Sequence, residues 1–177
     1  MRFLERQEVN LMDRINFTKY NLVSLTIGEV IEIIRRGNYN IHDNEFGDLN
    51  LQEATNLIRG QPNDMQNMKY RLLPAVAFNG TFSEIKETGI ETYSQITALD
   101  FDHVCDMEGL KARLTGCAHV FCVFTTPSGN GLKALVLHDN TDRSCSYISR
   151  CLLGSVLSCR TRALRPFPDG VVNTQKT

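Results

Sequence analysis

Three short apolar runs constrain the fold of this chain more than any other feature: 95–102, 119–125 and 132–138. Each run has the length of a strand and is too short for a buried helix. A helical pattern at 108–114 separates the first two runs, and a loop with two glycines at 127–131 separates the last two. Because strands and helices interleave in this way, the pattern predicts a sheet domain of the α/β or α+β class.

The residues that precede this sheet favour helices. Thr26 opens a capping-box pattern, apolar residues at helical spacing follow it, and Gly37 ends the predicted helix. Similar patterns predict a second helix near 50–59 and a third that begins at Pro62. Residues 1–25 have weak periodicity, so we expect an irregular or strand-containing arm there.

The chain is therefore expected to have three parts. Residues 1–74 form a mainly helical region, residues 75–140 form the core sheet that carries the chemical motifs, and residues 141–177 form a divergent tail. The core sheet is expected to start with a strand at 75–78, which the Asn79-Gly80 pair ends in a tight turn.

The tail differs from the rest of the chain in charge. Residues 1–140 carry 13 basic and 18 acidic residues, a net of −5, whereas residues 141–177 carry 6 basic and 2 acidic residues, a net of +4. Three of the six cysteines also fall in the tail. This change indicates either a truncated or frameshifted end or a genuine divergent end with a helix at 146–157.

Composition excludes several classes of protein. The 177 residues are 42% hydrophobic and 22% charged, which is ordinary globular usage. The sequence contains no apolar run of about 20 residues and no secretory signal at its start, so we expect a cytoplasmic protein without a membrane partner. Because the net charge is −1, any contact with nucleic acid must depend on a local patch.

Asp100-Phe101-Asp102 is the first motif that carries chemistry. Residues i and i+2 of a strand share a face, so both carboxylates can converge on one ion while Phe101 turns into the core. Two carboxylates at a strand end suit Mg²⁺ or Mn²⁺, which leave coordination sites for water and phosphate. The alternative is a strand end with two solvated acids. His103, the next residue, is either a surface histidine or a group that orients a carboxylate or contacts phosphate.

The loop 126–131, Thr-Pro-Ser-Gly-Asn-Gly, is the second motif. Gly129 and Gly131 permit backbone conformations in which N–H groups face outward as an anion site, Ser128 adds a hydroxyl, and Lys133 adds a charge that suits phosphate. The loop is not a P-loop, because GK[ST] is absent and a strand follows. A glycine hairpin with Lys133 on its solvated face is the alternative.

Together these motifs resemble the archaeo-eukaryotic primase, or prim-pol, superfamily, and more closely the bacterial mobile-element family with a VirE N-terminal-like domain. The resemblance is carried by KYRLLPAVAFNGTF (69–82), ITALDFDHV (96–104) and FTTPSGNGLKALV (124–136). It implies an α+β fold, with a helical N-terminal region before an RRM-like, largely antiparallel sheet that has helices on one face and is incomplete at the C-terminus.

The resemblance also implies a site. Asp100 and Asp102 would bind Mg²⁺ or Mn²⁺ as the catalytic metal ligands, and the phosphates of a nucleoside triphosphate would be bound by Ser128, Gly129, Gly131 and Lys133. The implied partners are that triphosphate, a DNA template-primer, and a helicase or other replication protein. Many members carry a histidine in the second motif, where the basic residue here is Lys133.

One departure bears on activity. The superfamily has a third acidic motif, and Asp169 is the only acid that residues 158–177 offer for that role. The predicted activity is primer synthesis or extension by a nucleotidyltransferase, which loss of this motif would inactivate. Lys69 and Arg71 would contact template phosphates or lie on a solvated helix face.

Two other functions fit parts of the pattern. One is a non-catalytic nucleotide-binding or interaction domain. The other is a haloacid-dehalogenase-type phosphatase, in which Asp100 would attack a phosphoryl group and Asp102 would act as general acid. A parallel, Rossmann-like sheet would favour the phosphatase, and an antiparallel sheet would favour the primase.

Overall fold

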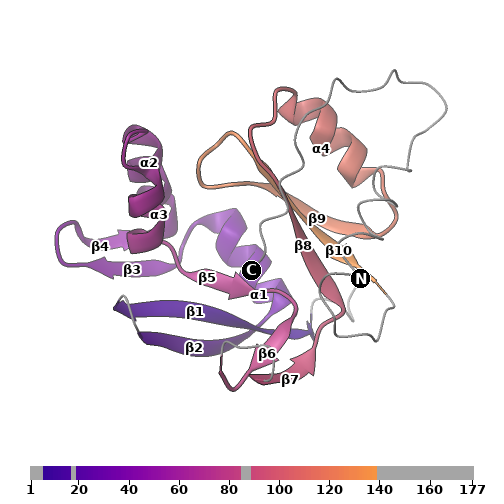
Figure 1. Ribbon diagram of the computed structural model, residues 1–177, viewed down its shortest axis with the longest axis horizontal. Helices are drawn as coiled ribbons and strands as arrows, with labels where there is room; N and C mark the ends of the chain where they lie inside the picture. The colour runs from indigo at the N-terminus through magenta and orange to yellow at the C-terminus, as the bar shows by residue number, and fades with distance from the viewer. Residues whose placement is uncertain (1–5, 17–18, 85–88, 139–177) are drawn as a thin grey trace. The chain divides into compact units, whose positions relative to one another are not determined.

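The computed structural model of the chain describes residues 6–16, 19–84 and 89–138 (Figure 1). The chain divides into two compact units, Met1–Ser94 and Gln95–Thr177. Helices and antiparallel strands make up the described part of both units, which confirms the α+β class. The expected tail, its helix at 146–157 and Asp169 lie outside the described residues.

The first unit contains a three-stranded antiparallel sheet of order β2-β1-β5, made of β1 (Glu8–Asn16), β2 (Lys19–Thr26) and β5 (Ala75–Ala77). Val9 and Leu11 of β1 are fully buried, and Asn10 between them is buried too, where its side chain donates to Ser24 Oγ and accepts from the Phe82 N–H. The prediction of a mainly helical region at 1–74 is therefore only partly right. The expected helices are present, but four strands accompany them.

Strand β5 also explains why the unit boundary differs from the expected one at residue 74. The strand pairs with β1, through Leu11 and Val76 among others, and so joins the first unit. The predicted tight turn follows β5, at Phe78 and Asn79, but the strand after the turn does not pair with β5. Instead, β6 (Gly80–Phe82) pairs with β7 (Ile90–Tyr93).

The helices of the first unit begin where side chains can cap them. In α1 (Ile27–Arg36), the Glu29 N–H donates to Thr26 Oγ1 and the Thr26 N–H donates to Glu29 Oε2, so the predicted capping box is present. Gly37 ends this helix with a φ of 65°. Helix α2 (Leu51–Gly60) has a second capping box, and α3 (Met65–Leu72) begins three residues later than predicted.

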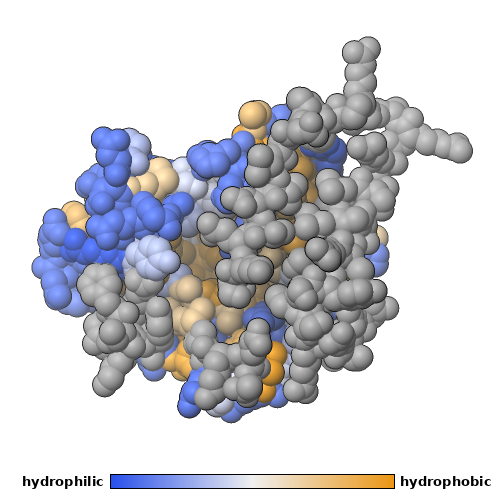
Figure 2. Space-filling view, in the orientation of Figure 1, coloured by the Kyte–Doolittle hydropathy of each residue, from blue (hydrophilic) through white to orange (hydrophobic). Residues whose placement is uncertain are grey.

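Helices α2 and α3 pack with a short hairpin of β3 (Asn40–Asp43) and β4 (Gly47–Asn50). Their buried core consists of Ala54, Ile58, Met68 and Leu72. The opposite side of α2 is polar, and the surface over this helix is mainly hydrophilic in Figure 2.

The second unit contains β8 (Ile96–Phe101), α4 (Met107–Thr115), β9 (Val120–Thr125) and β10 (Leu132–Leu137), close to the predicted bounds. The strand order is β8-β10-β9, and β10 is antiparallel to both neighbours. Strands β8 and β9 are therefore parallel to each other, and α4 connects them (Figure 1). Leu114 of α4 packs against Leu132 and Ala134 of β10, so the helix covers one face of this sheet.

Candidate functional site

The acidic motif and the glycine loop meet at one edge of the second unit's sheet. Leu132, the first residue of β10, lies opposite Phe101, the last residue of β8, and also opposite Thr125, the last residue of β9. The segment after β8 and the loop between β9 and β10 therefore leave the sheet at the same end. A hydrogen bond from the Val104 N–H to the Asn130 carbonyl, 3.0 Å long, joins the two segments.

The loop itself is folded by its own hydrogen bonds. The Thr126 N–H donates to the Gly131 carbonyl, the Gly129 N–H donates to the Thr126 carbonyl, and the Thr126 and Ser128 hydroxyls are 3.0 Å apart. Gly129 has a φ of 83°, a conformation that favours glycine. Its N–H is thus committed inside the loop. Ser128 and Asn130 are partly or fully exposed, and no hydrogen bond of their N–H groups is found within the described residues, whereas Gly131 is buried.

Gly131 serves the site for a steric reason. A Cβ atom at this position would lie 2.6 Å from the Phe101 carbonyl oxygen and 3.0 Å from Thr126 Oγ1. The missing side chain therefore lets the loop approach the end of β8, where the acidic motif begins. The sequence predicted that Gly131 gives the loop backbone freedom and binds phosphate. Its φ is not among the positive values of the described glycines, so close packing is what requires a glycine at this position.

The structure pairs two residues that the sequence analysis assigned to different ligands. Asp100 of β8 and Lys133 of β10 are directly opposite in the antiparallel register, and Lys133 Nζ lies 3.0 Å from Asp100 Oδ1. Their side chains are 41% and 29% exposed, respectively. Because Phe101 and Leu132 pack toward α4, the alternation of a strand places Asp100 and Lys133 on the opposite face of the sheet. Sequence patterns hold no signal for this register.

The second carboxylate lies just beyond the strand. Strand β8 ends at Phe101, Asp102 is exposed, and His103 adopts a φ of 52°. The two acids are therefore not successive same-face positions within one strand, as the sequence suggested, because the chain turns at His103 toward the glycine loop. The ring Nδ1 of His103 is 3.5 Å from Asn130 Nδ2, a distance too long for a strong hydrogen bond.

The side chains near Asp100 and Asp102 determine what kind of metal site these two residues could form. Among the described residues, no three His, Cys, Asp or Glu side chains lie together so that they could hold a metal ion. Mg²⁺ is commonly held by one or two carboxylates together with water and substrate phosphates. Asp100 and Asp102 therefore do not form a closed protein site, and an ion held by them would need water and phosphate as its other ligands.

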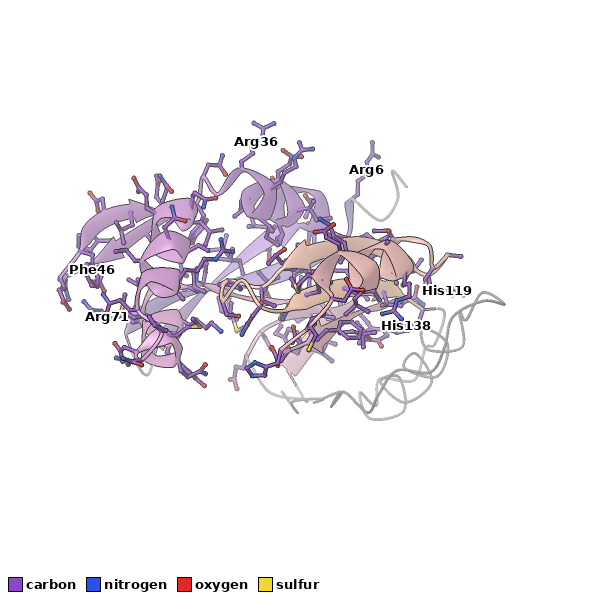
Figure 3. The ribbon with its side chains drawn as sticks, turned by 90° about the horizontal axis from the view of Figure 1, so that it is seen from above. Arg6, Arg36, Phe46, Arg71, His119 and His138 are labelled. Atoms are coloured by element: carbon purple, nitrogen blue, oxygen red, sulfur yellow. The ribbon has the colours of Figure 1, made fainter. Side chains whose placement is uncertain are left out.

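Arg71 has a structural role in the first unit. Its guanidinium donates to Asp43 Oδ2 at 2.7 Å, to Asp43 Oδ1 at 2.5 Å and to Glu45 Oε2 at 2.5 Å, and it lies 5.1 Å from the centre of the Phe46 ring (Figure 3). The Arg71 hydrogen bonds lower the pKa of Asp43 to about 2. The expectation that Arg71 lies on a solvated helix face is therefore wrong.

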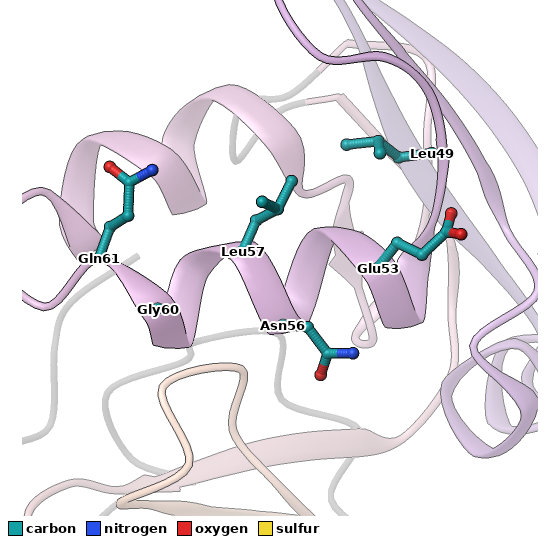
Figure 4. A pocket seen from close by; sticks show the side chains of 6 residues that line it. All are labelled: Leu49, Glu53, Asn56, Leu57, Gly60 and Gln61. Carbon is teal, nitrogen blue, oxygen red and sulfur yellow. The ribbon is translucent and has the colours of Figure 1, made fainter.

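A shallow pocket lies beside α2 in the first unit (Figure 4). It contains none of the residues that the sequence singled out. Its lining mixes apolar and polar side chains and consists of Leu49, Glu53, Asn56, Leu57, Gly60 and Gln61.

The comparisons with known proteins add one family. A protein-family model described as "BT4734-like, N-terminal domain" matches residues 67–151, just under half of the chain. The match includes both the acidic motif and the glycine loop. No curated protein and no solved structure matches the chain. No helix of the described residues combines the length and apolar character needed to cross a membrane.

Proposed function

We propose that the second unit is part of a prim-pol-type nucleotidyltransferase domain, which synthesises or extends primers on a DNA template with nucleoside triphosphates. One observation carries the proposal: the acidic motif at the end of β8 and the glycine loop before β10 lie at the same edge of the sheet, and Val104, just after the acidic motif, is hydrogen-bonded to the loop at Asn130. A carboxylate pair beside a cluster of N–H donors is the combination that a metal-bound triphosphate requires.

The strand order gives further support. A β-α-β-β segment in which the third strand lies between the first two makes up the first four of the six elements in the RRM-like, or ferredoxin-like, arrangement. Strands β8, β9 and β10 with helix α4 have this order. The antiparallel pairing counts against the phosphatase alternative, which requires a parallel, Rossmann-like sheet.

Each residue has a distinct role in this mechanism. Asp100 and Asp102 would hold Mg²⁺ or Mn²⁺, which supplies positive charge that lowers the barrier to in-line attack of a primer 3′-hydroxyl. Ser128 would donate a hydrogen bond to the phosphates, and Lys133 would bind them as a point charge, while Gly131 would let the loop lie close to the end of β8. Gly129 would stabilise the conformation of the loop, because its N–H donates a hydrogen bond to the Thr126 carbonyl.

A non-catalytic nucleotide-binding domain is the second candidate. It is favoured by the absence of a third carboxylate beside Asp100 and Asp102 among the described residues. Such a domain would bind a triphosphate through the same loop without joining it to a primer.

Template-directed extension by the full chain, with Mn²⁺ and all four deoxynucleoside triphosphates, distinguishes the two functions. A prim-pol domain is expected to extend a primer, and the Asp100→Asn/Asp102→Asn double variant is expected to lose this activity. Glu108→Gln, which changes an exposed acid of α4, is the matched control and should retain it. Triphosphate binding without extension would indicate the non-catalytic domain. Absence of both activity and binding would contradict the proposal.

A further inference from the structure

We propose that Asp100 and Lys133 form a latch that makes the site selective for a metal-complexed triphosphate over either the free divalent ion or the metal-free triphosphate. The inference rests on the proposed function, and it adds which chemical form of the ligand binds. It starts from the one ion pair that the structure places between the metal-ligand candidates and the phosphate-ligand candidates within the described residues.

The ion pair occupies the groups that both ligands need. Asp100 Oδ1, a candidate metal ligand, is 3.0 Å from Lys133 Nζ, a candidate phosphate ligand. A divalent ion on Asp100 would lie close to the ammonium group, and like charges at such distances repel. A triphosphate on Lys133 would lie close to the Asp100 carboxylate, which repels it for the same reason. The divalent ion or the triphosphate, when it binds alone, therefore has to break the ion pair between Asp100 and Lys133 and then lies near a group of the same charge.

The complex of metal and triphosphate removes both penalties. Its cation can take Asp100 while its phosphates take Lys133, so each protein charge exchanges one opposite charge for another. The exchange needs only side-chain movement, because lysine has a long flexible stem. The strands need not move. On either side of Lys133, Leu132 and Ala134 are buried in the core under α4.

The solvent exposure of the Asp100–Lys133 ion pair limits how much the pair can change the affinity for each ligand. Both side chains are partly exposed, and an exposed ion pair contributes at most about 1 kcal/mol, or about fivefold in a binding constant. Repulsion of the like-charged ligand adds to this. We therefore expect the free divalent ion to bind roughly three- to tenfold more tightly when the charge of Lys133 is removed. We expect the metal-free triphosphate to gain affinity by a similar factor when the charge of Asp100 is removed.

The test uses two variants of the full chain and two probes, Mn²⁺ and inorganic tripolyphosphate, with binding followed by calorimetry and by the paramagnetic signal of free Mn²⁺. Lys133→Met is expected to bind Mn²⁺ alone roughly three- to tenfold more tightly than the wild type, although it binds the Mn²⁺–tripolyphosphate complex more weakly. Asp100→Asn is expected to bind metal-free tripolyphosphate more tightly by a similar factor. Lys133→Gln should reproduce Lys133→Met, which guards against a folding defect in one variant.

Lys111→Met is the matched control, because it removes an exposed lysine from α4 in the same unit. It should bind both probes as the wild type does. Unchanged Mn²⁺ affinity in both Lys133 variants, or unchanged tripolyphosphate affinity in Asp100→Asn, overturns the latch while the proposed function stands if the wild type still binds the complex. A wild-type chain that binds no Mn²⁺–nucleoside triphosphate complex overturns both.

Discussion

Replacement of Arg71 by methionine tests how the first unit is held together. Arg71 forms two hydrogen bonds with Asp43, whose side chain is only 9% exposed, and a third with Glu45. Methionine keeps most of the apolar stem beside Phe46 but removes the guanidinium. Asp43 would then retain two backbone donors, the N–H groups of Glu45 and Phe46, and would be a buried carboxylate without a counter-charge.

The lowered pKa of Asp43 allows the expected loss in the free energy of unfolding to be calculated. The Arg71 hydrogen bonds, helped by the two backbone N–H groups, lower this pKa from its ordinary value of 3.8 to about 2. One pKa unit corresponds to about 1.4 kcal/mol of stability. Because Arg71 is 28% exposed and solvent screens the pair, we expect Arg71→Met to lower the free energy of unfolding at pH 7 by about 1–2 kcal/mol.

The pH dependence has a definite sign. A carboxylate whose pKa is lowered on folding contributes stability that is fully present above its ordinary pKa and is lost as the pH falls through its folded pKa. The stability difference between wild type and Arg71→Met should therefore be constant above about pH 5 and shrink between pH 4 and pH 2.

Urea unfolding at a series of pH values, followed by circular dichroism, measures this difference. Lys69→Met is the matched control, because Lys69 is on the same helix and has no carboxylate partner within the described residues. It should change stability by less than about 0.5 kcal/mol. An equal loss in both variants, or a loss in Arg71→Met that is the same at pH 7 and pH 2.5, would refute the reasoning.

Three further predictions concern single positions. Gly131→Ala should destabilise the second unit by about 1–3 kcal/mol in thermal melts, because the new Cβ would lie 2.6 Å from a backbone oxygen. Gly60→Ala is the control. Its Cβ would have no atom within 4 Å, so this change should be neutral or slightly stabilising in the same melts. Asn50→Ala removes the cap of α2 and should cost about 1 kcal/mol in urea unfolding. Asp102→Asn should weaken Mn²⁺ binding in the presence of a nucleoside triphosphate about tenfold or more, as titration with paramagnetic detection would show, and equal binding would remove Asp102 from the site.

Local patterns predicted the four helices of the described residues, β5 and the strands of the second unit, but not β3, β4, β6 or β7. Capping at Thr26, the glycine after α1 and the apolar runs that became β8, β9 and β10 all act through residues a few positions apart. Propensity and periodicity report such short-range interactions directly. The same patterns also predicted the two motifs of the candidate site, since each motif is a continuous segment.

The sequence alone determined which residues carry charge and which segments form the helices and the strands β8, β9 and β10, but only the tertiary structure decided which residues face each other. The pairing of β5 with β1, the ion pairs of Arg71 with Asp43, and the pairing of Asp100 with Lys133 all join residues far apart in the chain. Such contacts depend on strand register and on the packing of whole elements, and a shift of one residue would exchange the two faces of a strand. No local pattern encodes that choice.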